Sequence, residues 1–277
     1  MMTQPVARRL VVNADDFGRS ASVNEAVRLA CEQGILTNAS LMVNEPAAGD
    51  AARWAAGHPR LGIGLHLTLC QGFSALPPEE IPGLVDADGR FGNHPVALGC
   101  RYFFRPALRD QLYREISAQF RKLKALGLPC GHVDGHLHLH MQPAVFRLLA
   151  ENAGKWGVAR FRLVCEPLRP NLRAARGRWL RRFIHAAIFR GLAAFQRRRL
   201  RRLGIRFPRA VFGQLQDGRV TEDYLLRLLP QLRPGDSELY THPSMDEPRH
   251  EFEALVSPRV RDLAAHLGLR LIRYDQI

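Results

Sequence analysis

In Arg8-Arg-Leu-Val-Val-Asn-Ala-Asp-Asp-Phe-Gly18, an apolar run ends in two carboxylates just before the residues of a predicted helix. The run predicts a buried strand over residues 8–13. Ser22 and Glu25 have the spacing of a capping box, and apolar residues then recur at helical spacing as far as Gly34. A strand, a polar turn and a helix form the first half of a β/α unit.

The same unit recurs along the chain. Further strands are predicted at 36–44, 61–69, 131–140, 158–164, 237–241 and 269–273. About seven strands that alternate with helices favour parallel pairing, and hence an irregular (β/α) barrel, with an open doubly wound sheet as the second choice. Residues 70–106 are rich in Pro and Gly, so we expect a functional loop or lid there.

Length and composition indicate one globular domain. With 277 residues, 46% of them apolar, the chain can bury a large core, and we expect a single domain over 1–277. The five cysteines are an odd number without a CxxC pair, which argues against a disulfide framework or a thiolate zinc site. Residues 1–18 hold no secretory apolar segment, and no stretch reaches the roughly 18 apolar residues that span a membrane. These features predict a cytoplasmic protein.

The formal net charge of +14 is confined to one insertion, residues 167–209. This insertion contains 14 arginines and no Lys, Asp or Glu, whereas the rest of the chain holds 26 basic and 26 acidic residues. Apolar residues recur among the arginines at helical spacing, which predicts a basic amphipathic helix.

Two interpretations of this helix carry equal weight. It could contact an anionic membrane surface through Trp179, Phe183, Arg181 and Arg182, or it could pack on the core with a solvated basic face. Nucleic acid is the less favoured partner, because no helix-turn-helix, zinc finger or base-stacking motif is present.

Polar side chains end four of the predicted strands. They are Asp15-Asp16, His66, the histidines of 132–140, and His242. The carboxyl ends of parallel strands face one side of such a fold, where active sites are built, so these residues should converge. Each one alone has a plainer explanation as a helix cap, a core histidine or a surface histidine before a proline.

The strongest local signal is His132-Val-Asp134-Gly-His136-Leu-His138-Leu-His140. In an extended strand, residues of the same parity share a face, so four histidines and one aspartate would lie together. The plainer alternative is the solvated face of an edge strand. Because buried imidazoles without partners are costly, we favour a metal site in which the aspartate orients an imidazole. Spacing alone does not say which histidine is the ligand.

Taken together, these motifs resemble those of the YdjC-like carbohydrate deacetylases, which remove acetyl groups from N-acetylated sugars. The resemblance covers most of the chain and rests on five segments. They are Val11–Gly18, Gly64-Leu-His66, His132–His140, Thr241-His-Pro243 and the loop Leu84–Phe91. Leu137 departs from the pattern, because relatives often carry a third consecutive histidine at this position.

The resemblance implies roles for individual residues. Asp16, His66 and His136 would hold a divalent metal ion such as Mg²⁺ or Zn²⁺. Asp15 would be the general base, and we expect His242 to act as the general acid at the leaving group. The remaining polar residues of the cluster would support the ligands or touch substrate. They are His132, Asp134, His138 and His140.

The arginine insertion looks most like the hopanoid-biosynthesis branch of the family. That branch implies an N-acetylglucosaminyl group on a hopanoid glycolipid as substrate, an enzyme placed peripherally on the membrane, and a homodimer. The alternatives are a deacetylase of soluble chitooligosaccharides, another metal-dependent amidohydrolase or phosphoesterase, and a binding module whose histidines are structural.

Overall fold

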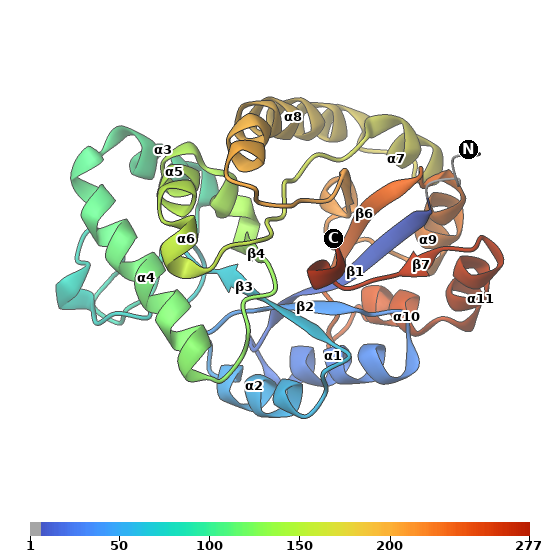
Figure 1. Cartoon of the computed structure of the whole chain (residues 1–277), viewed down its shortest axis with the longest axis horizontal. Helices are drawn as coiled ribbons and strands as arrows, with labels where there is room; N and C mark the ends of the chain where they lie inside the picture. The colour runs from blue at the N-terminus through green and yellow to red at the C-terminus, as the bar shows by residue number, and fades with distance from the viewer. Residues whose placement is uncertain (1–6) are drawn as a thin grey trace.

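In the computed structural model, which describes residues 7–277, a curled parallel sheet is surrounded by helices (Figure 1). Its strands run in the order β4-β3-β2-β1-β6-β5, and β7 also pairs with β1. Their bounds are β1 (Arg8–Phe17), β2 (Asn38–Leu41), β3 (Gly62–Leu67), β4 (Val133–Gly135), β5 (Ala210–Phe212), β6 (Gly235–Thr241) and β7 (Arg270–Leu271). Each of the pairings is parallel, as the alternating pattern predicts.

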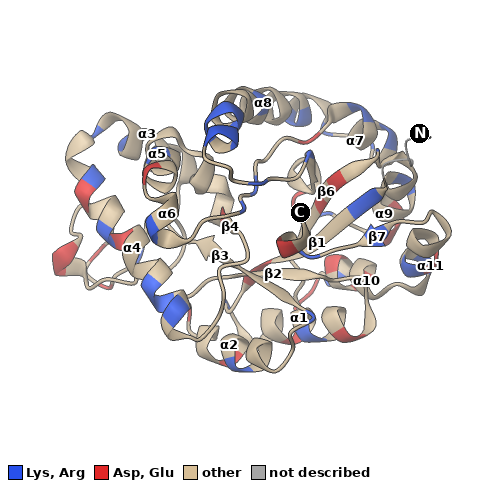
Figure 2. Ribbon diagram, viewed as in Figure 1, with Lys and Arg blue, Asp and Glu red and all other residues tan. Residues whose placement is uncertain are grey.

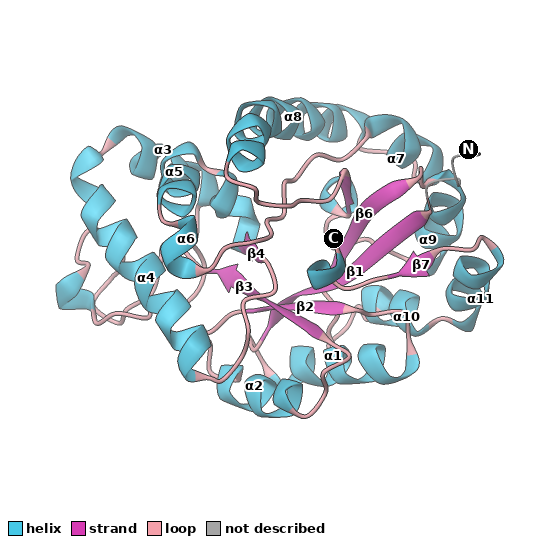
Figure 3. Cartoon of the chain, in the orientation of Figure 1, coloured by secondary structure: helices cyan, strands magenta, loops and turns pink. Residues whose placement is uncertain are grey.

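Helices cover the outside of the curled sheet (Figure 3). They are α1 (Ala21–Gln33), α2 (Ala48–Ala56), α3 (Pro95–Phe104), α4 (Arg109–Ala125), α5 (Pro143–Glu151), α6 (Ala153–Trp156), α7 (Leu168–Ala174), α8 (Trp179–Arg202), α9 (Glu222–Leu228), α10 (His250–Val256) and α11 (Pro258–His266). Of the short 3₁₀ turns, η3 (His136–Met141) and η4 (Gln214–Gln216) adjoin the site. Residues 1–6, which belong to the predicted domain and to the segment 1–18 expected to hold no secretory sequence, lie outside the described residues.

The curl comes close to a closed barrel. In the part of the chain that the structure describes, no ladder joins β4 to β5, and residues 160–165 lie between them instead. Phe161 bridges Val133 of β4, Arg160 bridges Arg206, and the Val211 N–H of β5 faces the Cys165 carbonyl at 3.5 Å. The parallel α/β architecture is therefore confirmed as a curled sheet near to a (β/α) barrel.

Two predicted strands are wrong. Residues 131–140 form a strand only at β4, because Leu137 (φ 51°) and His138 (φ 59°) adopt left-handed backbone that cannot extend a ladder. The alternation of faces therefore stops at Gly135. Residues 158–164 make isolated bridges rather than a strand. The strand that the sequence analysis did not predict is β5, which directly follows the arginine insertion.

Two predicted helix boundaries are also wrong. Ser20, not Ser22, caps α1, because its hydroxyl accepts the Val23 N–H, while the Ser22 hydroxyl faces that of Ser244 at 2.9 Å. The expected loop 70–106 also contains a helix, α3, which begins at Pro95. Proline suits the first turn of a helix, so the predicted loop ends there instead.

The insertion forms α7 and α8, and the basic residues of α8 are all arginines (Figure 2). The face of α8 that packs inward includes Arg182 and Gln196, whereas Trp179, Phe183 and Phe195 are exposed. Among residues 7–277, no helix is both long and apolar enough to cross a bilayer.

Candidate active site

The carboxyl ends of β1, β3, β4 and β6 bring the predicted polar residues together. Asp16 ends β1, His66 lies in β3 and His136 follows β4 directly. One oxygen of Asp16, Oδ1, lies 3.3 Å from His66 Nε2 and 2.9 Å from His136 Nδ1. The ligand atoms of these three buried residues lie within 4.8 Å of one another. Such convergence of lone pairs fits a divalent cation.

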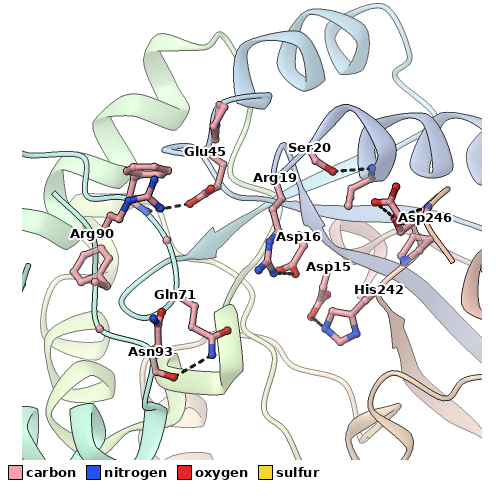
Figure 4. Close-up of a pocket in the computed structure, with 18 of the residues that line it drawn as sticks. Asp15, Asp16, Arg19, Ser20, Glu45, Gln71, Arg90, Asn93, His242 and Asp246 are labelled. Carbon is pink, nitrogen blue, oxygen red and sulfur yellow. Dashed lines mark hydrogen bonds and ion pairs between the residues drawn. The ribbon is translucent and has the colours of Figure 1, made fainter. Parts of the chain in front are cut away.

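The two adjacent aspartates point in different directions (Figure 4). Asp16 adopts φ 62° and faces Arg19, whose Nη1 is 2.8 Å from Asp16 Oδ2. Asp15 faces His242 instead, with Asp15 Oδ2 4.0 Å from His242 Nε2. A non-glycine residue at positive φ costs energy and is typical of functional sites.

The charges at the candidate metal site reinforce one another. Burial tends to raise the pKa of Asp16, but His136 and His66 lower it well below its ordinary value. Burial tends to lower the pKa of His66, yet Asp134 and Asp15 raise it to about 10. The buried carboxylates around Asp16 and His66 thus attract a cation, whether a proton or a metal ion.

Arg162 is the residue that the sequence analysis missed. Its fully buried guanidinium is 2.6 Å (Nη1) and 2.7 Å (Nη2) from the two Asp15 oxygens, 2.9 Å from Asp134 Oδ2 and 2.8 Å (Nε) from Glu238 Oε1. Burial tends to lower the pKa of Arg162, but the three carboxylates raise it well above its ordinary value. The sequence does hold one signal for Arg162, since it is a charged residue inside the apolar run 161–164. A charge buried with such a run requires partners of opposite charge.

Asp134 connects Arg162 to the candidate metal ligand His66. Asp134 Oδ1 lies 2.8 Å from His66 Nδ1, and Oδ2 accepts the Ser40 hydroxyl at 2.6 Å. A carboxylate on one ring nitrogen of a histidine orients the other nitrogen for a metal. His132 lies farther back, 3.0 Å from Ser40 Oγ and stacked on Tyr274.

His138 and His140 do not share the face of His136 that strand parity predicts. The His140 Nε2–H donates to the Arg162 carbonyl at 2.9 Å, and burial lowers the pKa of His140 to about 4, so the ring is neutral. His138 Nε2 lies 2.9 Å from the Tyr240 hydroxyl, and its ring packs edge-on against Phe189 of α8. Both histidines support the walls of the site.

His242 stands between carboxylates that were also missed. His242 Nδ1 is 3.5 Å from Asp217 Oδ1 and 3.7 Å from Glu251 Oε2, and its backbone N–H donates to Glu251 at 2.6 Å. Burial tends to lower the pKa of His242, but Glu251 and then Asp15 raise it to about 10. The imidazole is therefore protonated at neutral pH and can donate a proton.

A cleft of about 760 Å³ opens above these groups. Asp15, Asp16 and His242 line it, and the predicted loop forms one wall with Gln71, Phe73, Arg90 and Asn93 (Figure 4). The Arg90 guanidinium lies 4.2 Å from the centre of the Phe73 ring. Polar groups that converge in a cleft of this size suit a small polar ligand.

One predicted residue of the insertion is misplaced. Arg182 is only 3% exposed, because it donates to the Asn171 side chain and to the Ala175 carbonyl, both at 3.0 Å. It therefore anchors α8 to α7 and is not an exposed residue of the surface that α8 presents to solvent. Trp179 and Phe183 are 69% and 59% exposed, and Arg181 is also exposed.

Comparisons with known proteins identify the family of this chain. The family model described as YdjC-like protein matches residues 9–266. A carbohydrate deacetylase of Geobacillus stearothermophilus is 33% identical over 97% of this chain and 98% of its own. A chitooligosaccharide deacetylase of Enterobacter sp. (strain 638) is 35% identical over 54% of this chain and 57% of that protein.

A solved structure shows the same fold. A protein from Enterococcus faecalis V583, described as a candidate for cellobiose-phosphate cleavage, superposes with a TM-score of 0.76 over 98% of both chains at 23% identity. The full-length relative and the family model together decide the family. The chain belongs to the YdjC-like family of carbohydrate deacetylases, as its motifs predicted.

Proposed function

We propose that the protein hydrolyses the acetamide of an N-acetylated amino sugar, with a divalent cation bound by Asp16, His66 and His136. The observation that carries the proposal is the convergence of these three buried residues, of which Asp16 lines the cleft together with Asp15 and His242. Removal of an acetyl group from an amide needs a polarised carbonyl, a base for water and an acid for the amine.

The donor set fits the metal. His66 Nε2 and His136 Nε2 are buried and lack a hydrogen-bond partner within residues 7–277, which a ligand would supply. Asp15, His66 and Asp134 form a second group whose spacing could hold a metal ion. The carboxylates of Asp15 and Asp134, however, are already paired with Arg162. When bound, a divalent ion polarises the acetamide carbonyl and lowers the pKa of water.

Asp15 is the proposed general base. Arg162 and Asn13 hold its carboxylate in one orientation at the cleft, so it can accept a proton from water without moving. The water oxygen then adds to the carbonyl carbon.

His242 is the proposed general acid. Its protonated ring lines the same cleft, and it donates a proton to the amine nitrogen as the carbon–nitrogen bond breaks. The products are acetate and a free amino sugar.

The finer proposal is that the sugar is N-acetylglucosamine on a hopanoid glycolipid, at the cytoplasmic face of a membrane that the insertion contacts. Its support is the resemblance of the insertion and the exposure of Trp179, Phe183 and Arg181. The soluble chitooligosaccharide named for the Enterobacter relative is the alternative and fits equally. Other amidohydrolase or phosphoesterase chemistry is the less favoured alternative.

Acetate release tests both levels of the proposal. N-acetylglucosaminyl hopanoid and N,N′-diacetylchitobiose are incubated with EDTA-treated and with metal-restored protein. Metal-dependent release from the glycolipid alone supports the full proposal. Release from the chitobiose alone contradicts the hopanoid assignment, and release from neither by metal-loaded protein contradicts this substrate class.

A further inference from the structure

A small cavity beside the catalytic cleft gathers an unusual number of guanidinium groups. The cavity has a volume of about 30 Å³ and lies between the start of α8 and residues 214–219. Five arginines line it, against one carboxylate, that of Asp217. The arginines are Arg176, Arg178, Arg181, Arg182 and Arg219.

Most of this positive charge is uncompensated. Within residues 7–277, no carboxylate lies within 4.0 Å of the guanidinium of any of the five arginines. Clustered like charges repel one another, so an anion bound among them would be favoured.

A buried arginine forms part of the cavity wall. Arg182 is 3% exposed, its Nη atoms donate to Asn171, Ala175 and Gly177, and its Nε has no hydrogen-bond partner within the described residues. The first turn of α8 adds backbone N–H groups, because its N-cap, Arg178, makes no side-chain cap. A phosphate group matches such donors, since guanidinium groups and helix N-termini both bind phosphate oxygens.

The residues next to the cavity indicate what carries the phosphate. Trp179, Leu180 and Phe183, on the first two turns of α8, are 69%, 55% and 59% exposed. Exposed aromatic and aliphatic side chains beside arginines are typical of helices that lie in the interface of an anionic membrane.

We propose that this cavity binds the phosphate group of an anionic lipid headgroup, with Trp179, Leu180 and Phe183 at the acyl boundary. The site is separate from the deacetylase cleft, but Asp217 links the two, because it lines the cavity and lies 3.5 Å from His242. The lipid would therefore hold the catalytic cleft close to the membrane surface.

Calorimetric titration tests the proposal with three defined probes and metal-loaded, full-length protein. The probes are dihexanoyl phosphatidylglycerol below its micellar concentration, dihexanoyl phosphatidylcholine and inorganic phosphate. The variant is Arg181→Gln/Arg219→Gln, in which Arg182 is kept because it anchors α8. The matched control, Arg121→Gln/Lys124→Gln, removes the same charge from exposed positions on α4.

We expect phosphatidylglycerol to bind more tightly than either other probe, and inorganic phosphate to compete with it. The site variant should weaken binding roughly tenfold or more, because charge-assisted hydrogen bonds are lost. The control should stay within about twofold of the unchanged protein, since its charges lie elsewhere.

Three outcomes would overturn the proposal. If both variants bind phosphatidylglycerol equally weakly, net charge and not the cavity explains the loss. If phosphatidylcholine binds as tightly as phosphatidylglycerol, the site does not recognise an anionic headgroup. Inorganic phosphate that binds as tightly as phosphatidylglycerol would assign the cavity to a soluble phosphate ester. Acetate release from chitobiose, measured on the same samples, separates failure here from failure of the deacetylase proposal.

Discussion

At the scale of single residues, one buried arginine holds together the carboxylates at the candidate-site end of the curled sheet. The Arg162 guanidinium forms ion pairs with the carboxylates of Asp15, Asp134 and Glu238, and its backbone carbonyl accepts the His140 ring N–H. The arginine thus fixes both the proposed base and the carboxylate that orients His66. Because a buried charge without its partner is strongly destabilising, this arrangement also contributes to folding.

Replacing Arg162 with methionine should lower the free energy of unfolding by about 3–5 kcal/mol, because three buried carboxylates lose their cation. Urea denaturation followed by circular dichroism measures the change. Arg162→Lys is the milder comparison, since it keeps the charge but not the paired contacts. A loss below about 1 kcal/mol for the methionine variant, the range of an exposed ion pair, would contradict a central role for Arg162.

Asp15→Asn should abolish turnover while metal content stays near stoichiometric, because Asp15 is assigned to the base and not to the metal. Acetate release and metal analysis on the same preparation measure the two properties. Asp16→Asn is the paired comparison, and it should lose metal as well as activity. Loss of metal from Asp15→Asn would refute the division of roles.

The pH profile should report His242. The carboxylates beside it raise its pKa to about 10, so the protonated acid is present below that pH and is lost above it. We therefore expect kcat/KM to fall as pH rises through about 10. Glu251→Gln removes the charge that raises this pKa most and should move the alkaline limb to lower pH. An unmoved limb in that variant would exclude His242 as the titrating acid.

The candidate site residues were predictable because they follow apolar strands whose carboxyl ends must meet. Asp15, Asp16, His66 and His242 are of this kind. Arg162 was not predicted, because it lies inside an apolar run and its partners come from distant segments of the chain. Pairing of buried charges over such distances leaves no local pattern in a sequence.

At the scale of elements, the close approach of β3 to the segment before β4 depends on a glycine. A Cβ added at Gly64 would lie 2.3–2.5 Å from three atoms of the His132 ring, which is stacked on Tyr274. The ring cannot move aside freely, so β3 admits no side chain at this position.

Gly64→Ala should therefore lower the free energy of unfolding by about 1–3 kcal/mol, the usual cost of overpacking. Thermal denaturation measures it. Gly191→Ala in α8 is the control, because nothing lies within 4 Å of the added Cβ and alanine favours a helix. If Gly64→Ala is as stable as the control, the packing described for His132 is wrong.

Periodicity in the sequence predicts the longer strands better than the short ones. β1 and β3 contain apolar runs and β6 is seven residues long, whereas β4 and β5 have three residues each. The face that α8 presents inward was also unpredictable, because contacts of Arg182 with Asn171 and of Gln196 with the Met141 carbonyl outweigh the apolar pattern. Tertiary hydrogen bonds decide that orientation.

At the scale of the whole molecule, the arginine insertion packs against the candidate-site end of the curled sheet. Phe189 of α8 packs on His138, and Gln196 donates to the Met141 carbonyl at 2.6 Å, so α8 rests on the η3 turn that begins with His136. His185 of α8 lies 3.2 Å from Gln214, which precedes Asp217. The insertion therefore contacts the η3 turn, which contains the proposed metal ligand His136, and the segment that leads to Asp217 beside the proposed acid His242. A homodimer stays a prediction from the family resemblance.

If a metal bound by Asp16, His66 and His136 drives the reaction, two nearby histidines should differ sharply in their effect on metal binding. His136 and His138 would be equivalent on an extended strand, but only His136 faces Asp16. Metal content and acetate release are measured for His136→Ala and His138→Ala. We expect His136→Ala to lose both metal and activity, while His138→Ala keeps near-stoichiometric metal. Equal metal loss in the two variants, or full metal retention in His136→Ala, would contradict it.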